Sequence, residues 1–253
     1  MIKSLNMDTI KDKLIHADAV VQVATPITGT RYATKLFRNL IKVILLPRGR
    51  GHDCVCKGVL CGTTGEYNET LENCCKNDKI VSFSIVRNPY DIFTSYHFDG
   101  NDGIYNLNKR LGVISGNFDS FVREYFTRTF NYHLHNSRRA APYTRRFLFY
   151  RPFDSNGSCV VDFIIRFEHM DTAFSQIYEL FGKKHNPIKN SHKTNLKHYN
   201  YKHYWSDELI EWVQPYFKRQ LDFFGYNFDG PLDDYAILDP SQFKYNPLTD
   251  KIG

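Results

Sequence analysis

Two side chains in the middle of the chain, Arg87 and Ser95, have the types and the spacing needed to hold a phosphate group. Arg87 follows the β-prone run Ile80–Val86, and Ser95 lies about two turns into the helix predicted to follow. A guanidinium donates parallel hydrogen bonds to a phosphate, and a hydroxyl adds another. Taken alone, Arg87 fits a structural ion pair equally well. The combination of the two residues predicts an anion site.

A second anion site is predicted where another strand runs into a helix. The β-prone run Ala19–Ala24 leads into Thr25-Pro26-Ile27-Thr28-Gly29-Thr30, and a helical pattern follows. The N–H groups of such a loop and the positive end of the helix suit phosphate or sulfate, and Gly29 lets the backbone approach closely. Arg31 lies in the first helical turn, where a cation is disfavoured unless an anion sits nearby, and Lys35 lies one turn later.

The same helix carries two further cations, Arg38 and Lys42, which we interpret as part of its solvated face. The loop is not a Walker A motif, because the G-x-x-x-x-G-K-[ST] spacing is missing. A strand-to-helix turn with one glycine is weak evidence by itself.

The segment Val86-Arg-Asn-Pro-Tyr-Asp91, followed by Ser95-Tyr96, resembles the signature of the PAPS-dependent sulfotransferases, above all the carbohydrate-type and bacterial group. PAPS is 3′-phosphoadenosine-5′-phosphosulfate. Two later segments are similar to the family as well: Val161–Met170, with its Arg-Phe-Glu turn, and Tyr199–Phe228, which resembles its C-terminal helix. The resemblance runs from about Val20 to Phe228 in family order, and it implies a P-loop-like three-layer fold.

The resemblance also implies the role of each loop residue. The first loop, with Pro26, Ile27, Thr28, Gly29, Thr30 and Arg31, would wrap the 5′-phosphosulfate, while Arg87 and Ser95 would hold the 3′-phosphate. PAPS would be the co-substrate and 3′-phosphoadenosine-5′-phosphate (PAP) the product. We expect no metal, because the groups assigned to the phosphates are backbone N–H, Arg, Ser and Thr, with no acidic pair placed for magnesium.

The chain departs from the family pattern at Ile27, where the family usually carries Lys or Arg. That cation normally neutralises the bridging oxygen of the leaving phosphate, and sulfuryl transfer, like phosphoryl transfer, depends on charge stabilisation. We expect Arg31 or Lys35 to supply the charge. If neither does, the enzyme is slow or inactive.

Removing the acceptor's proton calls for a base, most often His or Glu. His52, in Gly49-Arg-Gly-His52, resembles the histidine that many relatives carry at the mouth of the site, and it is either the base or an ordinary loop residue. His97 is expected to be a histidine on a helix surface. Arg166 and Glu168 fit an internal ion pair as well as a place in the site. His133 and His135 are expected in a polar surface loop with several arginines.

The elements that position these residues alternate between strand and helix. Further strand and helix patterns occupy Cys159–Ile165 and the residues after it, where Phe174, Ile177 and Tyr178 are expected to face inward up to Gly182. A last helix is expected from a cap at Ser206 to Gly225. This alternation predicts an α/β fold with a mainly parallel sheet flanked by helices and a ligand at the carboxyl ends of its strands.

The length of 253 residues fits one large domain, with a core over about residues 18–228 and a C-terminal extension over 229–253. The 15% of aromatic residues allows a sizeable core. A formal charge of +6 suits an anionic ligand but falls short of the dense basic stripes of a nucleic-acid binder.

No run of 18 apolar residues or apolar leader is present, so a cytoplasmic protein without a membrane partner is expected. Five of the six cysteines fall between Cys54 and Cys75, without a C-x-x-C pair, and are predicted to be free thiols.

The leading hypothesis is therefore a sulfotransferase that acts on a hydroxyl or amine of a small molecule or glycan. One alternative is a catalytically impaired module of the same fold that binds PAP or another anion. A P-loop kinase is the less favoured alternative, since it would need the Walker lysine spacing. The oligomeric state stays open.

Overall fold

The computed structural model describes residues 2–17, 19–23, 30–40, 55–56, 59–60, 79–98, 117–135, 158–187 and 200–244. The chain divides into two compact units, each built from separate stretches of sequence. Unit 1 contains Met1–Val86, Phe149–Ser191 and Asp233–Gly253, and unit 2 contains Arg87–Leu148 and His192–Leu232. The single domain expected over residues 1–253 stays a prediction.

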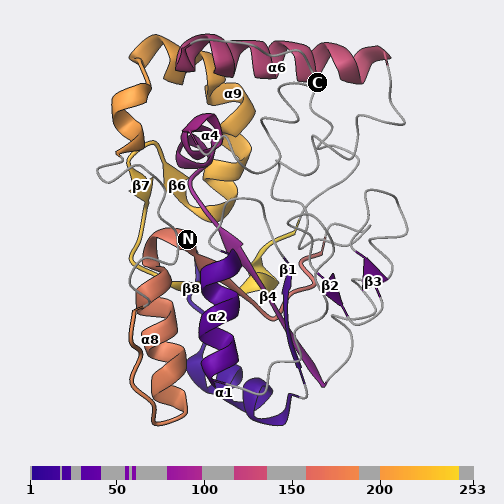
Figure 1. Cartoon of the computed structure of the whole chain (residues 1–253), viewed down its shortest axis with the longest axis vertical. Helices are drawn as coiled ribbons and strands as arrows, with labels where there is room; N and C mark the ends of the chain where they lie inside the picture. Colours follow the sequence, from indigo (N-terminus) through magenta and orange to yellow (C-terminus); the bar gives the residue numbers. More distant parts are fainter. Residues whose placement is uncertain are drawn as a thin grey trace. The chain divides into compact units, whose positions relative to one another are not determined.

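Unit 1 contains a four-stranded sheet in the order β1-β4-β5-β8 (Figure 1). Its strands are β1 (Ala19–Val23), β4 (Ile80–Val86), β5 (Phe163–Arg166) and β8 (Ile237–Leu238). The first three are parallel, and β8 is antiparallel to β5. The described residues thus combine helices with a small, mainly parallel sheet, as the alternating pattern predicts.

The carboxyl ends of β1, β4 and β5 lie at one edge of this sheet. Val23 pairs with Ser84, and Val86 pairs with Arg166. Because the strands are parallel, the segments that follow all three leave from the same edge. These segments begin with residue 24, Arg87 and Phe167, so the two predicted anion-binding segments start at the ends of neighbouring strands.

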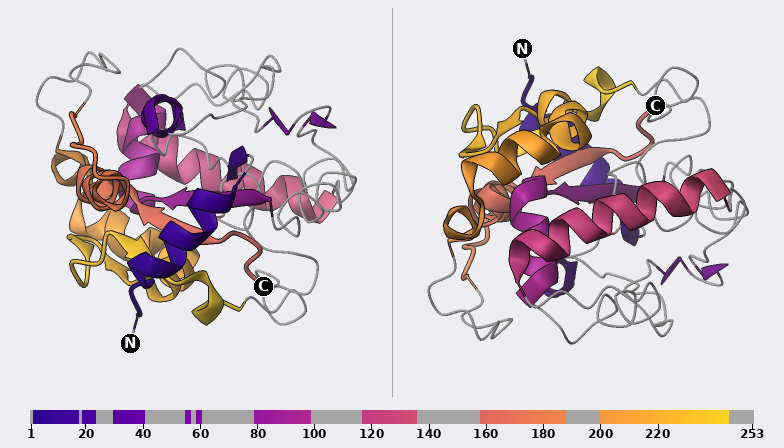
Figure 2. Two further views of the ribbon diagram at one scale, coloured as in Figure 1. Left: turned by 90° about the horizontal axis from the view of Figure 1, so that it is seen from below. Right: turned by 90° about the horizontal axis from the view of Figure 1, so that it is seen from above.

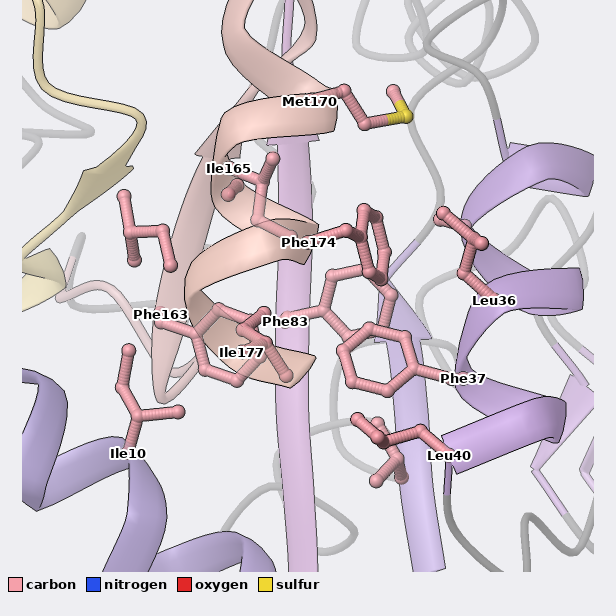
Figure 3. Packing of buried hydrophobic residues seen from close by; sticks show 14 of the residues in the cluster. Ile10, Leu36, Phe37, Leu40, Phe83, Phe163, Ile165, Met170, Phe174 and Ile177 are labelled. Carbon is pink, nitrogen blue, oxygen red and sulfur yellow. The ribbon is translucent and has the colours of Figure 1, made fainter. Parts of the chain in front are cut away.

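Three α-helices pack among the described residues of unit 1: α1 (Met7–His16), α2 (Thr30–Leu40) and α8 (Met170–Leu180). Between α2 and α8 lies a cluster of aromatic rings (Figure 3). Phe37 lies 4.7 Å from Phe83 and 5.1 Å from Phe174, and Phe83 stacks on Phe163 at 5.4 Å, measured between ring centroids. These buried rings attach both helices to the sheet.

The helices α2 and α8 also share a buried polar contact. Tyr178 of α8 donates its hydroxyl hydrogen to the carbonyl oxygen of Leu36 over 2.8 Å, and burial raises the pKa of that hydroxyl. Lys183, beyond the end of α8, donates to the carbonyl of Leu40 over 3.1 Å. The α8 helix ends before Gly182, as predicted, with φ of 62° at that glycine.

The strand predicted over Cys159–Ile165 is wrong at its start, because β5 begins only at Phe163. The reason lies in Asp162, whose carboxylate accepts hydrogen bonds from the backbone N–H of Ser82 (2.7 Å) and from the Ser82 hydroxyl (2.9 Å). The side chain of Asp162 therefore accepts from the N–H of Ser82, which a longer β4–β5 ladder would use. Lys13 pairs with the same aspartate.

The core of unit 1 extends past the predicted limits of 18–228 at both ends. Ile10 and Leu14 of α1 belong to it, and so does Ile237 of β8. The segment expected as a C-terminal extension thus supplies an edge strand of the sheet. Unit 1 also has a two-stranded hairpin of β2 (Val55–Cys56) and β3 (Val59–Leu60).

In the part of unit 2 that the structure describes, there are three α-helices and a short hairpin (Figure 2). They are α4 (Pro89–Phe98), α6 (Phe118–His135) and α9 (Asp207–Phe224); the hairpin strands are β6 (Tyr226–Asn227) and β7 (Gly230–Pro231), and a 3-10 helix, η2, spans Tyr201–Tyr204. Ser206 caps α9 by accepting from the N–H of Leu209, and Gly225 ends it with φ of 66°. Both ends match the prediction.

The structure corrects the surface loop expected around His133 and His135, because both residues lie in α6. The arginines after them lie outside the described residues. Among the residues that the structure describes, none of the helices is both long enough and apolar enough to cross a membrane.

Candidate anion site

The turn between β4 and α4 is fixed by Asn88. Its side-chain oxygen accepts from the backbone N–H of Tyr90 over 3.1 Å, and Pro89 begins the helix. An asparagine cap followed by proline is a strong local signal for a helix start, and the helix predicted to follow Ile80–Val86 is confirmed. The Asn88 amide also donates to the carbonyl of Asn227 (2.8 Å) and to the Tyr201 hydroxyl (3.3 Å). Contacts from β6 and η2 thus hold this turn.

The buried side of α4 is held by aromatic packing. Tyr90 is 1% exposed and meets the rings of Trp205, Phe217 and Phe228 edge-on, with centroids 4.9 to 5.0 Å apart. This burial raises the pKa of Tyr90 to about 12. Trp205 donates its indole N–H to the Thr94 hydroxyl over 2.9 Å, and that hydroxyl donates to the carbonyl of Tyr90. The helix is therefore a rigid support.

On this support the side chains of Arg87, Asp91 and Ser95 form one row. Arg87 donates from Nε to Oδ2 of Asp91 over 2.6 Å and from Nη2 to Oγ of Ser95 over 2.8 Å. Arg87 and Asp91 are each 7% exposed, while Ser95 is half-buried. The structure thus brings together the two residues predicted to share a phosphate.

Sequence reasoning gave no role to Asp91. The signal was present in part, because Asp91 and Ser95 are four residues apart in the predicted helix and so lie on one face of it. An aspartate in the first turn of α4 is also stabilised by the helix dipole. The pair with Arg87 brings together two buried charges of opposite sign.

The donors in this row suit a phosphate monoester. Ser95 accepts the bond from Arg87, so its hydroxyl hydrogen stays available, and within the described part of the chain it has no acceptor. Because Nε of Arg87 is bonded to Asp91, a phosphate would meet the Nη edge of the guanidinium beside that hydroxyl. The row can therefore offer charge-assisted and hydroxyl hydrogen bonds to one anion.

Most residues of the other predicted anion site, and the predicted base, lie outside the described residues: Pro26, Ile27, Thr28, Gly29 and His52. Thr30 and Arg31 begin α2, and Lys35 is exposed on the same helix. Their roles in binding or catalysis stay predictions.

His97 differs from the surface histidine that was expected. Its ring is half-buried and packs against Phe118 and Phe121 of α6, with centroids 5.4 and 5.1 Å away. Burial lowers the pKa of His97. A periodicity argument could not find this contact, because the partner helix lies more than twenty residues further along the chain.

Arg166, which could have paired with Glu168 or joined the site, is completely buried and bonded to Asp233. Its Nη1 and Nη2 donate to the two carboxylate oxygens of Asp233, and Nη1 also donates to the carbonyl of Tyr235. Burial raises the pKa of Asp233, but the hydrogen bonds and charge of Arg166 outweigh it and leave that pKa below its ordinary value. Glu168 is exposed in the turn η1 (Phe167–His169).

No family model matches the chain, and neither a curated protein nor a solved structure does.

Proposed function

We propose that the chain is a sulfotransferase that moves a sulfuryl group from PAPS to a hydroxyl or amine of an acceptor. The observation that carries the proposal is the contact of Arg87, which directly follows a central parallel strand, with Ser95 of α4. These are the two residues to which the resemblance gives the 3′-phosphate. Their donors fit a phosphate monoester, and PAPS has one at its 3′ position.

The arrangement of the strands supports the same proposal. The loop that resembles the phosphosulfate loop follows β1, and Arg87 follows its parallel neighbour β4. Ligands of parallel sheets bind at the carboxyl ends of the strands, and most favourably where strand order reverses. A P-loop-like three-layer architecture belongs to this proposal.

The proposed reaction is an in-line displacement at sulfur. The acceptor oxygen or nitrogen forms a bond to sulfur, and the bond from sulfur to the oxygen of the 5′-phosphate breaks, which releases PAP. His52 takes the proton of a hydroxyl acceptor, and Arg31 or Lys35 stabilises the charge on the departing oxygen. Arg87 and Ser95 bind the nucleotide and touch no reacting atom.

Titration calorimetry with the full chain tests the nucleotide specificity. We expect PAP to bind clearly more tightly than 5′-AMP and ATP, because neither of these carries a 3′-phosphate. Equal affinity for PAP and 5′-AMP would remove the 3′-phosphate from the site. Preference for ATP with magnesium would favour a kinase instead.

A second function, nucleotide binding without turnover, is favoured by one feature of the sequence, Ile27 in place of a basic residue. Removing one electrostatic donor from such a site typically costs about 3 kcal/mol of barrier. Release of PAP from PAPS in the presence of a panel of hydroxyl and amine acceptors separates the two functions. If PAP binds but no acceptor supports turnover, and Ile27→Lys restores it, the chain is the impaired form.

A further inference from the structure

We infer that Asp91 is a positioning residue for recognition of the nucleotide's 3′-phosphate, acting through Arg87. The inference rests on the proposed function and goes beyond it, because the resemblance assigned Asp91 no part in binding. Three observations carry it: the geometry of the Arg87–Asp91 contact, the burial of both side chains, and the hydrogen bond from Nη2 of the same guanidinium to Ser95.

The geometry shows which edge of the guanidinium Asp91 uses. Its Oδ2 accepts from Nε of Arg87 at 2.6 Å, a short charge-assisted bond, while Nη2 of Arg87 donates to Ser95. The guanidinium is planar and rigid, so hydrogen bonds from two of its nitrogens fix the orientation of the whole group. Asp91 therefore sets the direction in which the Nη edge points.

Burial makes this contact important for the charge of Arg87. The side chains of Arg87 and Asp91 are 9% and 11% exposed, so the positive charge of Arg87 has lost most of its hydration. The carboxylate of Asp91 compensates for that loss. Without it, the guanidinium gains by turning toward water and away from Ser95, and a ligand must then order it again during binding.

The 3′-phosphate of a bound nucleotide is attached to a ribose and cannot follow a displaced guanidinium. A guanidinium that is already oriented therefore binds the 3′-phosphate more tightly than a mobile cation does, because binding does not have to order the side chain. Asp91 also removes net positive charge from the row, which by itself would weaken binding. The gain in affinity from an oriented Arg87 guanidinium outweighs the loss in affinity from the reduced charge.

Asp91→Asn in the full chain tests the inference, since asparagine keeps the shape and removes the charge. We expect PAP affinity to fall by about tenfold, the equivalent of ordering one long side chain, while 5′-AMP affinity stays the same. In an Arg87→Lys background the same substitution should have almost no effect on PAP, because a lysine has no fork to orient. A residue that only supports folding would show no such dependence on Arg87.

Asp119→Asn provides a matched control. Asp119 accepts from Nε of Arg123 over 2.8 Å with the same four-residue spacing, but the pair is half-exposed on α6. This variant should bind PAP and 5′-AMP like the parent chain.

Asp91→Glu keeps the inference testable if Asp91→Asn does not fold. The glutamate keeps the charge and moves it by one methylene, so PAP affinity should fall severalfold without a change for 5′-AMP. Unchanged or tighter PAP binding in either variant would overturn the inference and leave the proposed function intact. A parent chain that binds PAP no better than 5′-AMP would instead contradict the proposed function.

Discussion

The guanidinium of Arg87 donates a 2.8 Å hydrogen bond from Nη2 to the hydroxyl of Ser95. Nε of the same guanidinium donates to Asp91 over 2.6 Å, so both contacts act on one side chain. An anion that binds both side chains would therefore lose little binding free energy to ordering them.

Replacing Ser95 with alanine should weaken PAP binding by about 1 kcal/mol, the usual contribution of one hydrogen bond. Stability should change little, because Ser95 is half-buried and alanine favours a helix. Calorimetry and a thermal melt check both expectations. Ser120→Ala, at an exposed position of α6, is the control. A PAP affinity equal to that of the parent would exclude the Ser95 hydroxyl from binding.

Arg87→Ala should affect both binding and folding. The loss of the guanidinium should weaken PAP binding by about 2 to 4 kcal/mol. It should also destabilise the fold by about 3 kcal/mol, because the buried carboxylate of Asp91 loses its charged partner.

The double variant Arg87→Ala/Asp91→Ala separates the two effects of Arg87→Ala. It should recover part of the stability and none of the PAP affinity. Urea unfolding and calorimetry on both variants check this. Equal stability of the single and double variants would show that the pair is unimportant for folding.

Several helix ends could be predicted because their signals are local. Asn88-Pro89 and Ser206 mark helix starts, and Gly182 and Gly225 mark helix ends, each through a contact with a residue at most five positions away. Both partners of such a contact are close together in the sequence, so propensity and capping rules predict it.

The contacts that were missed join distant parts of the chain. Arg166 and Asp233 are 67 residues apart, and β8 is only two residues long, so neither has a periodic pattern that marks its partner. The bonds of Asp162 to Ser82, which shorten β5, likewise span 80 residues. The row of Arg87, Asp91 and Ser95 was predicted in part because it is local, and Asp91 could have been found from its spacing.

The contact of Arg166 with Asp233 predicts a pH-dependent stability. The pKa of Asp233 is lowered in the folded chain, so its contribution is present above the ordinary value of 3.8 and is lost as the pH falls below it. Asp233→Asn should destabilise the chain by about 3 kcal/mol at pH 7, because Arg166 is completely buried.

The difference between Asp233→Asn and the parent should shrink in urea unfolding below pH 3.8. Asp229→Asn is the control, because its pair with Lys202 is exposed and should contribute under about 1 kcal/mol. If the two variants were equally stable, the buried pair would have no role in folding.

The burial of His97 predicts a second effect of pH on the stability of the fold, over a different pH range from that of Asp233. Burial lowers the pKa of His97 in the folded chain, so its stabilising contribution is present above the ordinary value of 6.5 and is lost as the pH falls below it. His97→Phe keeps the ring contacts with Phe118 and Phe121 and cannot be protonated. Between pH 7.5 and 5.5, about one unit on either side of the ordinary pKa, this variant should lose less stability than the parent in urea unfolding.

His203, which is exposed in η2, provides the comparison for His97. His203→Gln should follow the pH dependence of the parent chain. If His97→Phe and the parent show the same slope, the burial of His97 does not influence folding.

The most direct test of the central claim, that Arg87 and Ser95 bind the 3′-phosphate of the nucleotide, is the thermal melt of the full chain with PAP and with 5′-AMP. At about 100 times its dissociation constant, PAP should add about 2.7 kcal/mol and raise the melting temperature by several degrees, while 5′-AMP at the same concentration should raise it much less. In Arg87→Ala the two nucleotides should have equal effects. A melting temperature that millimolar PAP does not change, or that PAP and 5′-AMP raise equally in the parent chain, would contradict the account.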